Sequence, residues 1–309
     1  MIRAAVKVVL AVLLLFGAVK LIRGQASAEK LPSFDVISVK PGGPEGQTRS
    51  IFPLGPGDVY ITSGGHFSAE GYPLATYLYF AFQVLGSEMN AVQTQLPGWA
   101  ISDPFTIEAR TDGDPAKDTK DQMRLMMRSL LAERFGLKSH YETREVSIFA
   151  VGAAKTGKLG PQLQQHSEGD SPCNTVLSTG TTQIGGTTVA GGYPAQCGGL
   201  LGMAPSMPGR LRVGARNVAM AFIANQLTAL GDLGRPAVDQ TGLTGTFDFV
   251  IEFVPENLSR LPVGPDFQPD PDGPTFSQAV REQLGLKLDS TKGMSQFLII
   301  DHVERPTGN

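Results

Sequence analysis

The sequence is poor in the residue types that usually build catalytic and metal sites. Its 309 residues include two cysteines, four histidines and one tryptophan. The cysteines do not form a Cys-x-x-Cys motif, which argues against a redox pair or a zinc site. A Gly-x-Ser-x-Gly nucleophile elbow and a His-Glu-x-x-His zinc motif are also absent from the sequence. We therefore predict no catalytic residue, no bound metal and no cofactor, although distant residues can still assemble into a catalytic site.

A long apolar run occurs near the N-terminus. Two basic residues come first, followed by an uncharged run at 8–19 and by the small residues 26–28. This order is typical of a secretory signal peptide, so we expect residues 1–28 to be removed by cleavage after Ala28. Lys20 and Arg23 lie between the run and the cleavage site, which leaves an uncleaved membrane anchor as the alternative. The run is shorter than the about 20 residues that a bilayer span needs.

Positive charge is scarce in the predicted mature chain. The signal segment holds four of the 26 Lys and Arg residues and no Asp or Glu, which leaves 22 basic against 29 acidic residues. Nucleic-acid binding without sequence preference depends on clustered Lys and Arg. The sequence therefore predicts an exported protein, periplasmic or extracellular, with no nucleic-acid partner and with membrane contact only through an uncleaved signal segment.

The two cysteines, Cys173 and Cys197, lie in a Gly-rich stretch that has no charge between Ser171 and Gly209. An even cysteine count in an oxidising compartment predicts a disulfide. A disulfide between these cysteines closes a loop of about 25 residues, and in the chain-entropy model it stabilises the folded protein by on the order of 3 kcal/mol.

The second half of the chain repeats the first. Residues 121–138 return as residues 276–287, and in each copy a polar segment and then an apolar strand-like run follow, at 147–151 and at 296–300. Both helical segments begin with Thr-x-x-Gln, the form of a capping box, and stop at a glycine. A duplicated module favours a scaffold function over an enzymatic one.

The remaining periodicity completes the fold prediction. Predicted strands are 34–40, 66–70, 105–109, 210–213 and 246–253, and further helices begin at Pro73 and cover 218–230. Each repeat then reads strand, helix, strand, helix, strand, which is an α+β plan. We expect a first repeat at 29–154, a Gly-rich, disulfide-stapled connector at 155–209, and a second repeat at 210–309 with a Pro-rich insertion at 255–274.

Several segments resemble a secreted family of unknown function described as soil-associated proteins. The resemblance rests on residues 34–41 (FDVISVKP), 96–99 (LPGW), 130–138 (LLAERFGLK) with 143–145 (TRE), 234–249 (GRPAVDQTGLTGTFDF) and 300–306 (IDHVERP). It implies export and, in some relatives, attachment to sensor-type membrane peptidases, and it supplies no catalytic residues. The order of elements in each repeat is also similar to the short N-terminal modules of secretins and TonB-dependent transducers. That second resemblance implies protein contacts in the periplasm and concerns the fold alone.

Three residues are candidates for partner binding. Trp99 is either a surface anchor for a partner or part of the core. Arg235 and Asp239 flank a distinctive segment and either line a groove for a partner strand or hold local structure. In the second interpretation Arg235 pairs with Asp239, or Asp239 bonds backbone amides and fixes the following turn.

Two further polar patterns have ordinary explanations. The pairs His140/Glu142 and His302/Glu304 resemble zinc ligands, but polar pairs at strand edges are the commoner arrangement. The acidic run at 266–272 resembles part of a calcium loop, but prolines interrupt it.

We therefore expect a non-enzymatic scaffold module that binds another envelope or extracellular protein, by strand addition at a sheet edge. The alternatives are a secreted hydrolase with its site between the repeats and a ligand-sensing domain.

Overall fold

The computed structural model describes most of the chain after the predicted signal segment. The described residues are 31–43, 48–55, 57–60, 63–111, 119–155, 158–167, 169, 173, 188–257 and 267–306. The predicted signal peptide and its cleavage site therefore lie outside the described residues. Pro32–Asn309 forms one compact unit. Within the described ranges, the helices are too short or too polar to span a membrane.

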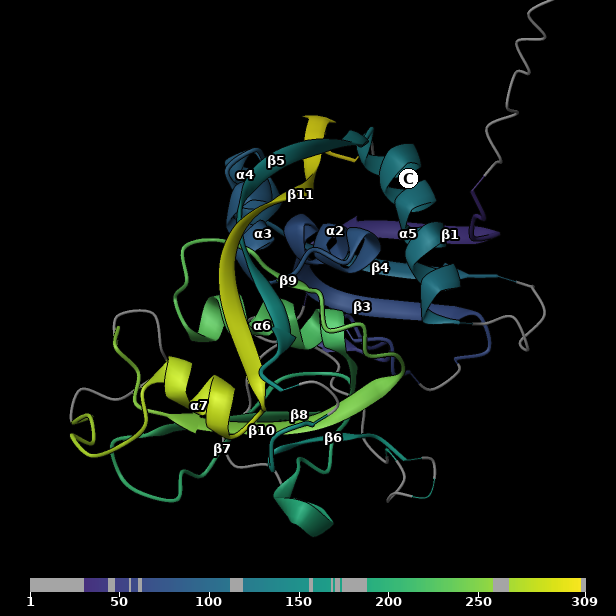
Figure 1. The fold of residues 1–309 in the computed structure, drawn as a ribbon. Helices are drawn as coiled ribbons and strands as arrows, with labels where there is room; N and C mark the ends of the chain where they lie inside the picture. The colour runs from purple at the N-terminus through teal and green to yellow at the C-terminus, as the bar shows by residue number, and fades with distance from the viewer. Residues whose placement is uncertain are drawn as a thin grey trace, which may run out of the picture. The chain divides into compact units, whose positions relative to one another are not determined.

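The N-terminal half builds a four-stranded antiparallel sheet with helices beside it (Figure 1). Its elements are β1 (Val36–Pro41), β2 (Arg49–Ser50), β3 (His66–Pro73), α2 (Leu74–Phe82), α3 (Gly86–Gln93), α4 (Gly98–Ser102), β4 (Pro104–Arg110), α5 (Lys120–Phe135) and β5 (Lys138–Ala153). The strand order in its sheet is β1-β4-β3-β2.

The C-terminal half repeats the plan, so the α+β prediction is confirmed. Its elements are β6 (Leu163–Gln165), a 3-10 turn (Ala190–Gly192), β7 (Leu201–Met203), β8 (Leu211–Ala219), α6 (Met220–Leu230), β9 (Ala237–Asp239), β10 (Thr246–Phe253), α7 (Phe276–Glu282) and β11 (Leu286–His302). Its sheet has the order β6-β10-β8-β7. The order β3-α2-β4-α5-β5 therefore returns as β8-α6-β10-α7-β11.

The predicted helix signals explain where α5 begins and ends. The Thr119 hydroxyl accepts a hydrogen bond from the Gln122 amide at 3.2 Å, which satisfies one free amide of the first turn. Gly136 ends the helix with φ 57°, a left-handed conformation that costs glycine least. The methionines of α5 are buried in the core.

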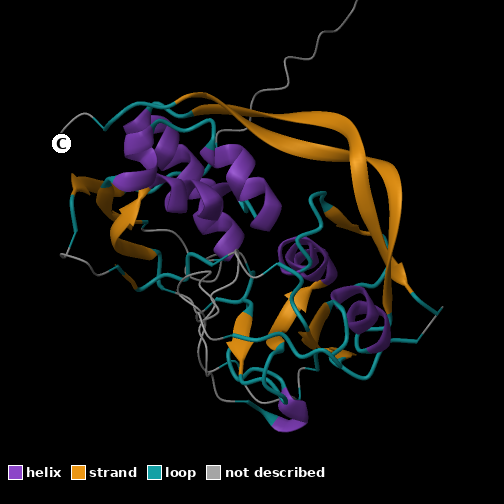
Figure 2. Cartoon of the chain, turned by 90° about the vertical axis from the view of Figure 1, so that its left-hand side faces the viewer, coloured by secondary structure: helices purple, strands orange, loops and turns teal. Residues whose placement is uncertain are grey.

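β5 and β11 are much longer than the sequence indicated. They pair antiparallel along almost their whole length, from Leu286 opposite Ala153 to His302 opposite Lys138. Figures 1 and 2 show them as one long, curved two-stranded ribbon. The polar segments that precede the apolar runs at 147–151 and 296–300 belong to these strands. They are largely exposed, and because neither face covers a core there, they lack the alternation that predicts a strand.

Each strand of the ribbon starts on the core of its own half and ends on the core of the other half. Leu137, just before β5, belongs to the hydrophobic core of the N-terminal half, here called the first core, whereas Val151 of β5 belongs to that of the C-terminal half, the second core. β11 runs the other way, with Leu286 in the second core and Leu298 in the first. The two halves thus exchange a strand.

The ribbon also has an internal twofold symmetry. The Gly-Leu-Lys sequence that follows each helix aligns the two strands and makes Glu145 the counterpart of Met294. These two residues lie opposite each other in the observed register. Between the pairs Leu288/Val151 and Ile300/Ser139, every pair of facing residues on one side of this point therefore has an equivalent pair on the other side, and a register shift after Ile300 ends the symmetry.

Candidate functional site

Trp99 lies at the border of the first core. Its ring packs edge-on against Phe105, with the centroids 6.2 Å apart. The Arg305 guanidinium lies 5.2 Å from the Trp99 centroid and also pairs with Asp103 at 2.8 Å. Trp99 is therefore half-buried beneath an arginine, and its partner-binding role stays a prediction.

Arg235, just before β9, and Asp239, the last residue of β9, bond to different groups. The Arg235 guanidinium lies 4.3 Å from the Phe149 ring centroid and donates to the Ser290 hydroxyl at 2.9 Å. Asp239 accepts from the amide and the hydroxyl of Thr241, at 2.9 and 2.7 Å. Asp239 thus fixes the turn after β9. Partner binding by either residue stays a prediction.

The histidine and carboxylate pairs form polar contacts at the end of the ribbon. His140 lies 2.9 Å from Asp301 through Nδ1 and 3.4 Å from Glu142 through Nε2. The hydrogen bond to Asp301 raises the pKa of His140. His302 lies 3.5 Å from Glu304. Among the residues that the structure describes, His, Cys, Asp and Glu side chains form no group able to hold a metal ion.

The acidic run that resembles a calcium loop is held by an arginine. Asp270 accepts from Arg210 Nε at 2.8 Å, and this bond lowers the pKa of the Asp270 carboxyl. Asp270 also accepts from the Asp272 amide at 3.0 Å. Asp266 lies outside the described residues. Asp270 therefore joins this segment to the start of β8.

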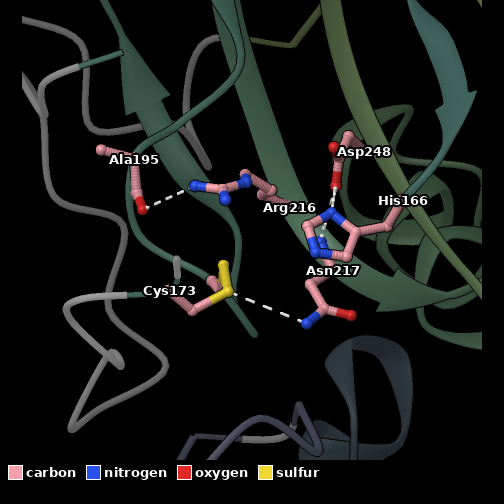
Figure 3. The surroundings of a disulfide bond; sticks show 7 residues. His166, Cys173, Ala195, Arg216, Asn217 and Asp248 are labelled. Carbon is pink, nitrogen blue, oxygen red and sulfur yellow. Dashed lines mark hydrogen bonds and ion pairs between the residues drawn. A yellow bond between two sulfur atoms is a disulfide. The ribbon is translucent and has the colours of Figure 1, made fainter. Parts of the chain in front are cut away.

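The predicted disulfide between Cys173 and Cys197 is present, with Cα atoms 5.5 Å apart. Beside it, β8 carries a bulge opposite Asp248, where Asn217 has φ 55°. Asp248 Oδ1 accepts from the Asn217 amide at 2.9 Å and lies 2.8 Å from His166 Nδ1 (Figure 3). Asn217 Nδ2 lies 3.8 Å from Cys173 Sγ. These contacts connect the cysteine-containing loop to the sheet of the C-terminal half.

A buried arginine completes this cluster. The Arg216 side chain has no solvent exposure, and its Nη1 donates to the Ala195 carbonyl oxygen at 3.1 Å (Figure 3). Its Nε and Nη2 atoms have no hydrogen-bond partner among the described residues. The Arg216 carbonyl oxygen in turn accepts from the Gly198 amide at 2.9 Å. Arg216 therefore holds the chain on both sides of Cys197 against β8.

Replacing both cysteines by serine is expected to lower the free energy of unfolding by about 2 to 4 kcal/mol, because the open chain gains conformational freedom when unfolded. Urea titration of the variant against the oxidised protein measures this change. Treating the unmodified protein with a thiol reductant should give the same shift. An unchanged midpoint in both experiments would show that the contacts of Arg216 and Asn217 hold the loop without the disulfide.

A disulfide of this kind indicates an oxidising, exported location.

A cavity of about 480 Å³ lies between residues 57–59 of the N-terminal half and the start of α6. Its described lining is largely apolar and contains one carboxylate, that of Asp58. Asp58 is bound to Arg124 at 2.8 Å. Glycoside hydrolysis commonly uses two carboxylates, and nucleophilic catalysis needs a nucleophile with a base. The described lining of this cavity contains neither two carboxylates nor a nucleophile with a base. The hydrolase therefore stays an alternative for which this cavity offers no catalytic site.

The C-terminal half places a third strand, β9, on the edge of β5. Ala237–Asp239 runs parallel to residues 149–151, with Val238 opposite Ala150. The Phe149 amide donates to the Pro236 carbonyl oxygen at 2.8 Å, and the Gln240 amide donates to the Val151 carbonyl oxygen at 2.9 Å. In a parallel pair with this register, the peptide groups of Val238 face Phe149 and Val151.

The equivalent edge of β11 holds a side chain in place of a strand. The repeat puts Leu298 and Ile300 of β11 where Phe149 and Val151 lie on β5. Gln95 Nε2 donates to the Leu298 carbonyl oxygen at 3.2 Å, and Gln95 Oε1 accepts from the Ile300 amide at 2.9 Å. A carboxamide has the donor and acceptor of a peptide group. Gln95 therefore takes the place that Val238 takes in the other half.

A cavity of about 340 Å³ opens beside this contact. One wall is α3, with Glu88, Ala91 and Val92, and the other is β11, with Phe297 and Leu298. In the described sheet, β11 is an edge strand whose strand neighbour is β5. The edge of β11 next to α3 thus combines backbone groups that no described strand pairs with a hollow for a side chain. We call this region the β11 edge site.

These features define a duplicated α+β protein whose halves share a strand pair and whose C-terminal half carries a disulfide between β6 and β7. Residues 75–303 match the family described as "Protein of unknown function (DUF3738)". The match covers well over half of the chain, so the chain belongs to this family. It runs from α2 to the end of β11 and includes both repeats. No curated protein and no solved structure matched the chain. This match fits the expectation of a family of unknown function. None of these comparisons supports the resemblance to secretin and TonB-dependent transducer modules.

Sequence reasoning missed the β11 edge site. Gln95 is an exposed residue between two short helices, and its partners on β11 are more than two hundred positions away. One signal was present in the repeat. The segment at 234–240 has no counterpart in the first repeat, where α3 and α4 stand instead. A strand present in one half and absent from the other indicates an unfilled position on the sheet.

Proposed function

We propose that this protein is an exported, non-enzymatic binding module that captures an extended segment of another protein at the β11 edge site. The observation that carries the proposal is the pair of hydrogen bonds from Gln95 to Leu298 and Ile300. They mark the edge position that β9 fills in the other half. A partner strand would displace the Gln95 side chain and pair with β11 in parallel.

Physical chemistry favours this use of the edge. Strand addition draws its affinity from main-chain hydrogen bonds and its selectivity from pockets for alternate side chains. The backbone groups of Leu298 and Ile300 supply the main-chain hydrogen bonds. The cavity between α3 and β11 supplies the pocket for a side chain. Gln95 satisfies two backbone groups in the free protein, which reduces the tendency of an open edge to aggregate.

The test uses a peptide with the sequence of residues 234–240, because this segment already pairs with the equivalent edge of β5. We expect the peptide to perturb the amide signals of Leu298 and Ile300 in NMR spectra and to protect the Ile300 amide from hydrogen exchange. In Gln95→Ala the competing side chain is gone, and its two hydrogen bonds contribute about 1 kcal/mol each. This variant should bind the peptide up to about thirtyfold more tightly.

Two controls separate strand pairing from other binding. Gln93→Ala removes an exposed glutamine from the end of α3 without touching the edge, and it should leave the affinity unchanged. A peptide N-methylated at the position of Val238 keeps every side chain but lacks an amide hydrogen needed for pairing, so it should not bind. Equal binding of the methylated peptide, or an affinity that Gln95→Ala does not raise, would refute strand addition at this edge.

A further inference from the structure

We infer that the β11 edge site selects a segment that carries a basic residue two positions before the strand it adds, and that Glu88 and Tyr141 receive this residue. The inference rests on the proposed function, since it names the partner chemistry of the same site. Three independent observations support it: the internal template at β9, an exposed aromatic ring, and an unpaired carboxylate.

The template is the contact of Arg235 with the ribbon. Arg235 lies two residues before β9, and its guanidinium covers Phe149 and donates to Ser290. Phe149 and Ser290 face each other across the ribbon. The structure therefore already contains an extended segment whose arginine lies over one facing pair of β5 and β11.

The twofold symmetry of the ribbon identifies the equivalent pair. Leu298 is the counterpart of Phe149, and Tyr141 is the counterpart of Ser290. Leu298 and Tyr141 also face each other in the register. Tyr141 has 47% of its surface exposed, which is unusual for a large aromatic residue next to a core. An exposed ring at this point offers a cation a favourable face.

The charge at the site is also suited to a cation. Glu88 lines the cavity beside Leu298. Burial is the main cause that raises the pKa of the Tyr141 hydroxyl, the Arg128 charge lowers it, and the charge of nearby Glu88 adds a smaller rise. Burial raises the pKa of the Glu88 carboxyl. Among the described residues, the Glu88 carboxylate has no hydrogen-bond or ion-pair partner. A positive group on the incoming segment would compensate for its lost hydration.

The nearby arginines already have partners. Arg128 lies 4.8 Å from the Phe82 ring centroid, and its Nε donates to the Ala81 carbonyl oxygen at 2.7 Å. Arg144, which lines the cavity, donates to Glu142 at 2.8 Å. Both guanidinium groups are directed to other contacts, which leaves Glu88 as the charged group in the described lining without a partner.

The experiment compares two peptides on three proteins. One peptide has the sequence of residues 234–240, and the other has alanine in place of its arginine. In the Gln95→Ala background, we expect the arginine peptide to bind about five- to tenfold more tightly than the alanine peptide. Adding Glu88→Gln should reduce this ratio to below about two. Adding Glu145→Gln, an exposed acid on the same ribbon outside the cavity, should leave the ratio unchanged.

A second readout does not depend on affinity. The arginine peptide should lower the pKa of the Glu88 carboxyl, followed by NMR of its side-chain carbon, whereas the alanine peptide should not. Equal binding of the two peptides to the Gln95→Ala protein would overturn this inference and leave strand addition intact. Failure of both peptides to bind would overturn the inference together with the proposed function.

Discussion

The two halves of the protein, produced as separate chains at 32–154 and 155–306, are expected not to fold alone and to regain structure when mixed. In isolation, the first fragment lacks Leu298, which belongs to its core, and exposes the end of β5, which belongs to the other core. Burying a side chain of this size contributes about 1.5 to 3 kcal/mol. The partly buried Ile300 and Val303 are lost with Leu298, and the total is comparable with the whole stability of a fragment this small.

The single tryptophan gives a direct measurement. Trp99 packs at the border of the first core, so its fluorescence in the first fragment should be that of a solvated indole. Adding the second fragment should shift the emission to shorter wavelength and restore a cooperative urea transition. The control is the full chain cut once in the connector, which should stay folded because both strands remain present. Cooperative unfolding of the first fragment alone would show that the exchanged strands are not needed.

The second large effect concerns a buried lysine. Lys120 has 4% exposure, and its Nζ donates to the carbonyl oxygens of Gly55, at 2.7 Å, and Gly57. Burial lowers the pKa of Lys120 from 10.5 to about 7 in the folded protein, with nearby Arg124 as the next cause. Between these two values the unfolded chain binds a proton that the folded protein does not bind. The free energy of unfolding therefore rises with pH across this window.

Urea titrations between pH 6 and pH 10 measure the effect. One pKa unit corresponds to about 1.4 kcal/mol, so this group should add on the order of 4 kcal/mol between pH 7 and pH 10. Lys120→Met should remove most of the rise and should be more stable than the unaltered protein at pH 6. Lys138→Met changes an exposed lysine at the start of β5 and should keep the rise. A Lys120→Met protein with the original pH dependence would show that the amine is hydrated.

Local signals were enough to predict the repeated elements. Helix α5 lies between its caps Thr119 and Gly136, and β10 covers 246–253, as their patterns indicated. The length of β5 and β11 was not predictable, because a two-stranded ribbon exposed on both faces has no apolar alternation. The exchange of the two strands was also hidden. It depends on which core an apolar run joins, and runs such as 147–151 and 296–300 suit either core.

The candidate site shows the same limit. Sequence analysis favoured distinctive residues, and Trp99, Arg235 and Asp239 prove to have packing or hydrogen-bonding partners inside the structure. Gln95 and Glu88 have no distinctive sequence context. Their interest comes from their position against β11, and that position follows from the long-range pairing of the ribbon. The Arg235 segment was nonetheless informative, since it supplies the internal template for the peptide.

The exchanged strands also set the order in which the protein can mature. The first core contains side chains from β1, α2 and α5, which leave the ribosome or a translocation channel early, and from β11, which leaves almost last. Contacts between such distant segments form slowly, because a long loop must close first. Until residues near Leu298 emerge, the first half stays an incomplete intermediate. A chain that crosses a membrane through a narrow channel must remain unfolded, so in an exported protein this topology would delay folding until the crossing is nearly finished.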